Sequence, residues 1–170
     1  AAKVGDVIAV TGKLGISSKG LVDIMFGDLN TAAAKAHRKG QARTAEGVWL
    51  GTRPEVHAMM DISDGLSSEL MHICTQSNVG CAIYEDKLPI DYQAAALAEE
   101  MNLNIVTCAL NGGEDYELLF TCSLDDYEKL IPLEDVYLIG HITKPELGTN
   151  LIGRNGEELA LQAQGWNAFK

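Results

Sequence analysis

The sequence has no long apolar run, no strongly basic segment and no closely spaced cysteine pair, and each absence excludes a class of protein. A membrane-spanning helix needs about 18 or more consecutive apolar residues, and no segment approaches that length. The first residues lack the apolar stretch of a secretory signal peptide. The 170 residues carry 13 Lys and Arg against 24 Asp and Glu, a net charge of −11, which argues against a nucleic-acid-binding surface.

The cysteines and histidines show no metal-binding or catalytic spacing. Four cysteines stand singly inside apolar segments, at positions 74, 81, 108 and 122, and the four histidines are scattered. Zinc sites usually bring paired Cys or His at short spacing, and disulfide frameworks are typical of smaller secreted chains. We therefore expect buried free thiols in a cytoplasmic protein that binds neither membrane nor nucleic acid.

Short apolar strands and helices mix along the chain. The hydrophobic pattern predicts strands over residues 7–11, 58–62, 79–84, 116–122 and 136–142, and two short strands around residues 151 and 159 that flank an Asn-Gly turn. It predicts helices over residues 31–39, 66–76, 92–101 and 124–130, whereas residues 14–30 stay ambiguous because three glycines interrupt them. The absence of strict βαβ alternation favours an α+β fold, with a mixed, largely antiparallel sheet and helices packed on it, in one domain over residues 1–170.

The stretch from Met60 to Leu66, MDISDGL, is the most informative one. It places Asp61 and Asp64 three residues apart, with Ser63 between them, on a strand-to-helix turn. Such a turn offers carboxylate oxygens to a hard cation and free helix N–H groups to an anion. It also fits ordinary helix capping by Ser63 or Asp64, with Gly65 easing the turn.

Two further stretches, and a basic helix, carry candidate ligand-binding groups. In NGGEDYE, residues 111–117, a glycine pair precedes the adjacent acids Glu114 and Asp115, which either face a ligand or are solvated on a surface turn. Near the end of the chain, Trp166 either plugs a core edge or forms a stacking wall for a planar heterocycle. The predicted helix at 31–39 is basic, which fits a solvated face or a phosphate-binding patch.

These motifs occur in a fixed order: DVIAVTGKLG from Asp6, MDISDGL from Met60, NGGEDYELLFT from Asn111, IGHI from Ile139, and GW near the end. In this order they resemble the C-terminal half of thiamine-monophosphate kinase, of the superfamily that includes aminoimidazole ribonucleotide synthetase and selenophosphate synthetase. The resemblance covers nearly the whole chain. Residues 16–55 depart from the family pattern, so no family contact is carried over to them.

The resemblance implies an ATP- and Mg²⁺-dependent enzyme that phosphorylates thiamine phosphate to thiamine diphosphate. By motif position, Asp61 and Asp64 would hold Mg²⁺, Ser63 would contact the nucleotide, and Glu114 and Trp166 would contact thiamine phosphate. Phe169 lies close enough to Trp166 to be confused with it. No residue is singled out as catalytic, because metal ions and positioning carry this reaction.

The resemblance also implies a two-domain enzyme of which this chain is the single C-terminal domain. The N-terminal domain of the family supplies most Mg²⁺-binding aspartates, ATP contacts and the dimer interface. We therefore expect a homodimeric whole enzyme and an inactive, monomeric isolated chain. Two alternatives stay open: a related ATP-dependent enzyme that acts on another substrate, such as an amidine or selenide, and a non-catalytic binding module.

Overall fold

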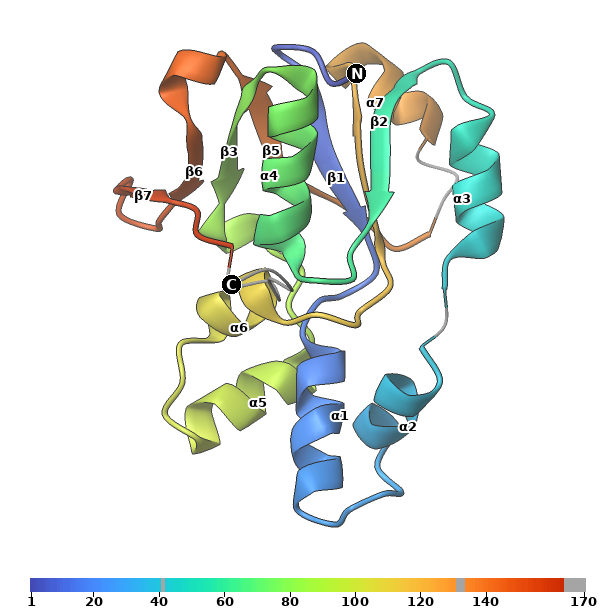
Figure 1. The fold of residues 1–170 in the computed structure, drawn as a ribbon, viewed down its shortest axis with the longest axis vertical. Helices are drawn as coiled ribbons and strands as arrows, with labels where there is room; N and C mark the ends of the chain where they lie inside the picture. Colours follow the sequence, from blue (N-terminus) through green and yellow to red (C-terminus); the bar gives the residue numbers. More distant parts are fainter. Residues whose placement is uncertain (41, 131–133, 164–170) are drawn as a thin grey trace.

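A computed structural model describes residues 1–40, 42–130 and 134–163 of the chain (Figure 1). Within this part, one seven-stranded sheet has the order β2-β4-β1-β5-β3-β6-β7. The strands are β1 (Val7–Thr11), β2 (Val56–Asp61), β3 (Gly80–Tyr84), β4 (Leu118–Cys122), β5 (Val136–Thr143), β6 (Thr149–Ile152) and β7 (Glu158–Ala160). Neighbouring strands pair antiparallel except for the parallel pair β3–β6, which confirms the predicted mixed, largely antiparallel sheet.

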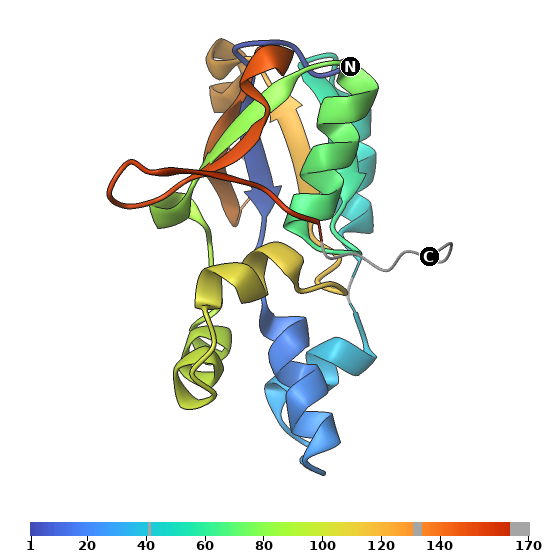
Figure 2. The same cartoon turned by 60° about the vertical axis from the view of Figure 1, so that its left-hand side comes forward.

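The helices divide into those that cover the sheet and those that lie beyond the ends of its strands. They are α1 (Ile16–Met25), α2 (Ala32–Arg38), α3 (Thr44–Gly51), α4 (Leu66–Ser77), α5 (Tyr92–Glu100), α6 (Ile105–Asn111) and α7 (Leu124–Leu130), with short 3-10 turns at Glu85–Lys87 and Pro145–Leu147. Figures 1 and 2 show α4 against the sheet, while α1, α2, α5 and α6 gather below it. None of the helices in the described ranges has the length and apolar character that a membrane span requires.

The inner strand β1 confirms the strand predicted over residues 7–11, and it is buried on both faces. Ile8 and Val10 enter the core cluster that contains the α4 residues, and Val7 and Ala9 enter a second cluster on the opposite face. Leu50 of α3 and Leu130 of α7 belong to that second cluster. Side chains alternate between the faces of a strand, so a strand with helices on both faces needs apolar residues at every position.

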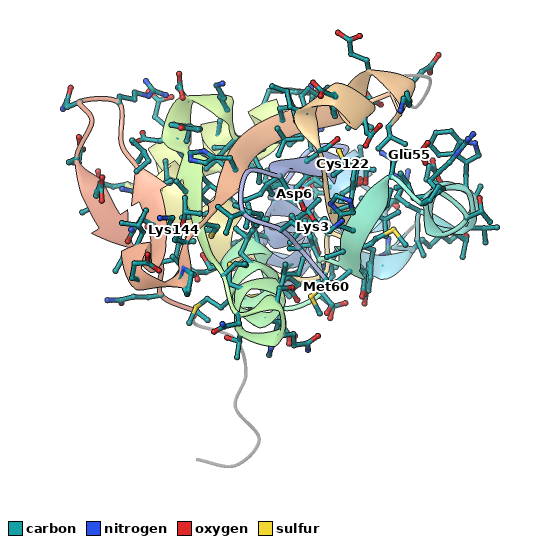
Figure 3. All side chains as sticks on the ribbon, turned by 90° about the horizontal axis from the view of Figure 1, so that it is seen from above. Lys3, Asp6, Glu55, Met60, Cys122 and Lys144 are labelled. Atoms are coloured by element: carbon teal, nitrogen blue, oxygen red, sulfur yellow. The ribbon has the colours of Figure 1, made fainter. Side chains whose placement is uncertain are left out.

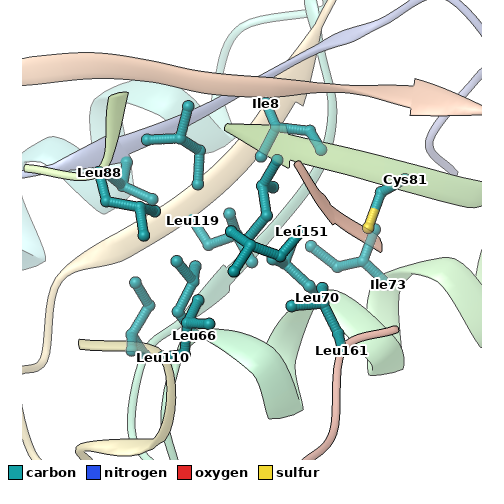
Figure 4. Packing of buried hydrophobic residues seen from close by; sticks show 14 of the residues in the cluster. Ile8, Leu66, Leu70, Ile73, Cys81, Leu88, Leu110, Leu119, Leu151 and Leu161 are labelled. Carbon is teal, nitrogen blue, oxygen red and sulfur yellow. The ribbon is translucent and has the colours of Figure 1, made fainter. Parts of the chain in front are cut away.

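The apolar face of α4 forms the centre of the larger core. Leu66, Leu70 and Ile73 are buried there, which confirms the face predicted from their helical spacing. Figure 4 shows them packed among apolar side chains of the sheet, such as Ile8 and Leu119. This packing fixes the direction in which α4 leaves the end of β2.

Three helices were missed in the sequence: α1, within the ambiguous residues 14–30, and α3 and α6, which were not predicted at all. Helix α1 contains Gly20 because a Cβ there would lie 2.1 Å from the carbonyl oxygen of Ala33 in α2. The predicted strand at 116–122 is shorter than expected, since β4 begins at Leu118. Glu114 and Tyr116 have positive φ angles of 67° and 54°, which are incompatible with a strand.

At the far end of the sheet, His57 contacts a buried aspartate. The Asp6 carboxylate accepts the N–H of Lys3 and lies 2.8 Å from Nδ1 of His57. Figure 3 shows Lys3 and Asp6 near one another at this end of the molecule.

The four cysteines are free as predicted, but Cys108 is only half-buried, whereas the other three are buried.

Candidate functional site

Two loops meet at the lower end of the sheet in Figure 1. The aspartate turn, residues 61–65, connects β2 to α4, and the glycine loop, residues 112–117, connects α6 to β4. Strands β2 and β4 are antiparallel neighbours with Asp61 opposite Leu118. The end of β2 and the start of β4 therefore lie side by side, so both loops leave the sheet at the same end of its strands. Two motifs that are distant in the sequence form one site.

Backbone hydrogen bonds join the two loops beyond the last strand pair. The N–H of Ile62 donates to the Glu117 carbonyl at 2.8 Å, and the N–H of Tyr116 donates to the Ile62 carbonyl at 3.0 Å. One residue further on, the N–H of Glu114 donates to the Ser63 carbonyl at 2.8 Å. The loops are thus held in a fixed register by the same groups that pair strands.

Glycines allow this close approach. A Cβ on Gly113 would lie 2.5 Å from the carbonyl oxygen of Ser63. Gly65 has a φ of +115°, and a Cβ there would lie 2.9 Å from the Leu110 carbonyl oxygen. A larger residue at Gly113 would force the two loops apart, and one at Gly65 would collide with the end of α6.

The carboxylates of the aspartate turn are open to solvent. Asp61 and Asp64 are exposed, and Ser63 is half-buried beside them. Among the residues that the structure describes, no three His, Cys, Asp or Glu side chains are grouped as a metal site. Two exposed carboxylates nevertheless fit Mg²⁺, which is usually held by one or two carboxylates together with waters and substrate phosphates.

The start of α4 is not capped by the side chains that the sequence offered for this role. The N-cap of α4 is Gly65, with no side-chain cap, so the prediction of Ser63 or Asp64 as N-cap is wrong. Instead, Oε1 of Glu69 accepts the N–H of Asp64 at 3.0 Å and the N–H of Ser63 at 3.4 Å. These two amides precede the helix and are therefore not free for an anion. Burial raises the pKa of Glu69.

The two acids of the glycine loop have different environments. Glu114 is exposed and accepts a hydrogen bond from the Tyr116 hydroxyl, which raises the pKa of Tyr116. Asp115 points inward and accepts the N–H groups of Gly15 at 2.8 Å and Ser17 at 3.2 Å, at the start of α1. Burial raises the pKa of Asp115 to about 6. The surface-turn alternative thus describes Glu114 but not Asp115, which ties the glycine loop to α1.

Glu117 connects the glycine loop to two other segments. Its Oε2 accepts hydrogen bonds from the Thr11 hydroxyl at 2.6 Å and from the Nε–H of Arg43 at 2.8 Å. Its Oε1 lies so close to Gly12 that a Cβ on this glycine would be only 2.1 Å away. The hydrogen bond to Glu117 raises the pKa of Arg43. Arg43 lies in the stretch that departs from the family pattern, so this stretch contributes to the walls of the site.

Open pockets surround the two loops. One of about 340 Å³ has Asp61, Tyr116, Arg43 and Val48 in its walls. Another, of about 180 Å³, has Glu114 and Lys39 in its walls. Lys39 belongs to the basic stretch around α2, so one lysine of that stretch faces the site. Trp166 and Phe169 lie outside the described residues.

Sequence reasoning missed Glu69, Arg43 and Glu117. Glu69 carried one weak signal, since an acid in the first turn of a helix often interacts with N–H groups there. Glu117 closes the NGGEDYE stretch and Arg43 follows the basic helix predicted at 31–39, but neither pattern predicted their contact, because it depends on how distant segments pack.

The fold and this loop pair define the class of protein. Residues 3–149 match the family described as AIR synthase related protein, C-terminal domain. The chain belongs to this family.

Within the family, the chain is similar to thiamine-monophosphate kinases. It is 35% identical to the enzyme of Buchnera aphidicola subsp. Acyrthosiphon pisum over 99% of the chain and 54% of that relative, and 35% identical to the enzyme of Pyrococcus abyssi over 97% and 50%. The structure of AaThiL complexed with AMPPCP and TMP matches 99% of the chain and 52% of that protein, with 31% identity and a TM-score of 0.83. The chain thus spans about half the length of these relatives.

More distant structures share the fold alone. E. coli HypE, a hydrogenase maturation protein, matches 99% of the chain with a TM-score of 0.77 but only 19% identity. The same sheet and helices therefore occur with very different sequences, and the fold by itself does not define a substrate.

Proposed function

We propose that this chain provides the C-terminal half of the active site of a thiamine-phosphate kinase. The enzyme would transfer the γ-phosphoryl group of ATP to thiamine phosphate and yield ADP and thiamine diphosphate. The observation that carries the proposal is the 2.8 Å hydrogen bond from the Glu114 N–H to the Ser63 carbonyl, which brings the proposed substrate-binding acid beside the turn proposed to hold metal and nucleotide. Similarity to kinases over 99% of the chain, and to a protein that holds the ATP analogue AMPPCP together with TMP, supports it.

In this proposal each motif residue has a separate task. Asp61 and Asp64 hold Mg²⁺, Ser63 contacts the nucleotide, and Glu114 contacts thiamine phosphate together with Trp166. When bound, Mg²⁺ offsets the negative charge that two phosphates bring together. The exposed Glu114 carboxylate suits the cationic ring of thiamine, because opposite charges attract.

The chain need not supply a general base. The acceptor oxygen belongs to a phosphate that is ionised at neutral pH, so the task of the protein is to align it with the γ-phosphorus. The backbone bonds between the aspartate turn and the glycine loop serve this alignment, because they hold the nucleotide side and the acceptor side at a fixed separation.

Tryptophan fluorescence tests substrate binding. Trp166 and Trp49 are the two tryptophans of the chain, and the ring of Trp49, on α3, lies 4.2 Å from the Arg53 guanidinium. The variant Trp49→Phe therefore leaves Trp166 as the sole reporter. We expect saturable quenching by thiamine phosphate in the presence of Mg²⁺. A flat titration, both with this chain and with the protein that includes the proposed N-terminal domain, would contradict the assignment of Trp166.

Turnover tests the reaction. In the two-domain protein, Asp61→Asn should lower the rate of ADP release with thiamine phosphate about 100-fold or more, while circular dichroism stays unchanged. Asp86→Asn, which replaces an exposed aspartate outside both loops of the site, is the matched control and should keep the wild-type rate. A near-normal rate for Asp61→Asn would refute its role. Faster turnover with an amidine or selenide acceptor would favour the related-enzyme alternative.

We further propose that the chain is one domain of a two-domain, cytoplasmic enzyme, since it spans about half the length of its relatives. The N-terminal domain would supply the remaining Mg²⁺-binding aspartates, ATP contacts and the dimer interface. Light scattering should then find a homodimer for the two-domain protein and a monomer for this chain. Turnover should require both domains.

A further inference from the structure

Glu69 is a buried carboxylate in the first turn of α4, and it folds back toward the aspartate turn. Only 2% of the residue is exposed. Its Oε1 lies 3.0 Å from the amide nitrogen of Asp64 and 3.4 Å from that of Ser63. The Ser63 hydroxyl lies 3.5 Å from the same oxygen, at the outer limit of a hydrogen bond.

The other carboxylate oxygen has no partner. Oε2 of Glu69 is buried and makes no hydrogen bond to any residue within the described ranges. A buried charged oxygen without a donor costs free energy, and an apolar residue of similar size would avoid this cost. Stability of the fold therefore does not explain a glutamate at this position.

Oε1 of Glu69 accepts a hydrogen bond from the peptide group that joins Ser63 to Asp64. The carbonyl of Ser63 and the N–H of Asp64 belong to the same peptide group. Its carbonyl accepts the N–H of Glu114 at 2.8 Å, and its N–H donates to Glu69. The peptide is thus clamped between the glycine loop and α4, and its orientation sets where the side chains of Ser63 and Asp64 point.

We propose that Glu69 is a positioning residue, which clamps the Ser63–Asp64 peptide so that the Ser63 hydroxyl and the Asp64 carboxylate are presented to the nucleotide and its metal ion. This inference rests on the proposed function. Glu69 itself touches neither substrate nor metal. It acts through the backbone of the aspartate turn. Burying its carboxylate is unfavourable, but the hydrogen bond that it accepts there makes the turn rigid.

Two substitutions separate positioning from stability. Glu69→Met keeps the size and removes the acceptor, and Glu69→Gln keeps one acceptor oxygen. Hydrogen exchange on this chain should find the Asp64 amide exchanging about tenfold faster or more in Glu69→Met, with Glu69→Gln in between. The melting temperature of Glu69→Met should equal or exceed that of the wild type. Glu99→Met, at an exposed position of α5, is the matched control and should leave the Asp64 amide unchanged.

Turnover of the two-domain protein completes the test. Glu69→Met should lower kcat for phosphoryl transfer about 10- to 100-fold with a much smaller change in KM for thiamine phosphate, and Glu69→Gln should recover part of the loss. Wild-type kcat in Glu69→Met, or a loss that only follows a lower melting temperature, would overturn the positioning role. If the wild type does not phosphorylate thiamine phosphate, the proposed function fails, and the exchange experiment still decides whether Glu69 clamps the peptide.

Discussion

Arg43 and Glu117, 74 residues apart in the sequence, form an ion pair in which Nε of Arg43 lies 2.8 Å from Oε2 of Glu117. The pair joins the segment before α3 to the residue that precedes β4. Only 26% of the Arg43 side chain and 13% of the Glu117 side chain are exposed. The pair is therefore better shielded from solvent than a surface ion pair, and it holds one wall of the pocket that contains Asp61 and Tyr116.

A double-mutant cycle measures this pair. Arg43→Met leaves the shielded Glu117 carboxylate with the Thr11 hydroxyl as its remaining side-chain donor in the described part of the chain, so it should destabilise the protein by about 2 kcal/mol. With Glu117→Gln, the cycle should give a coupling energy of about 1–2 kcal/mol in urea unfolding. The pair of Arg154 and Glu85 is the control, because it is 3.4 Å long and 75% of the Arg154 side chain is exposed. Its coupling should not exceed about 0.5 kcal/mol, and equal couplings would contradict the prediction.

Gly113→Ala should separate the two loops of the site. The new Cβ would meet the Ser63 carbonyl oxygen at 2.5 Å, so we expect a loss of about 2 kcal/mol in the free energy of unfolding. Gly47→Ala on α3 is the matched control, because its Cβ would lie at an ordinary 3.7 Å from the Leu118 side chain. That change should stabilise the protein by about 0.5–1 kcal/mol. Urea unfolding of both variants provides the measurement, and two equal effects would contradict the close approach of the loops.

Asp115 should make the protein less stable as the pH rises through 6. Burial raises its pKa from 3.8 in the unfolded chain to about 6 in the folded one, so the folded state binds the proton more tightly. The resulting stabilisation is fully present below about pH 4 and is lost as the pH passes 6. It should amount to about 3 kcal/mol relative to Asp115→Asn, in which it is absent.

The titration of the Asp115 carboxyl, followed by NMR, checks this directly. An inflection near pH 6 is expected, and one below about pH 4.5 would mean that the amides of Gly15 and Ser17 favour the ionised carboxylate more than burial disfavours it. Asp86→Asn controls for the loss of one surface charge in the unfolding experiments.

Much of the sheet could be predicted because its strands carry local signals. The run over residues 7–10 is apolar at every position, which favours a strand that is buried on both faces. The glycine-containing helices were harder to predict. Gly20 disfavours a helix by its own propensity, and it is present in α1 because a larger residue would collide with Ala33 of α2. A packing requirement of this kind leaves no periodic pattern in the sequence.

The sequence by itself determined the chemical groups of the site and the local elements that carry them: the aspartates on a strand-to-helix turn and the acids after a glycine pair. Only the tertiary structure decided which of these groups meet. The antiparallel pairing of β2 with β4 joins the two loops, turns Asp115 toward α1 and leaves Glu114 in solvent. It also brings Arg43 to Glu117. Local signals reach only a few residues along the chain, whereas these contacts depend on which distant apolar faces pack together.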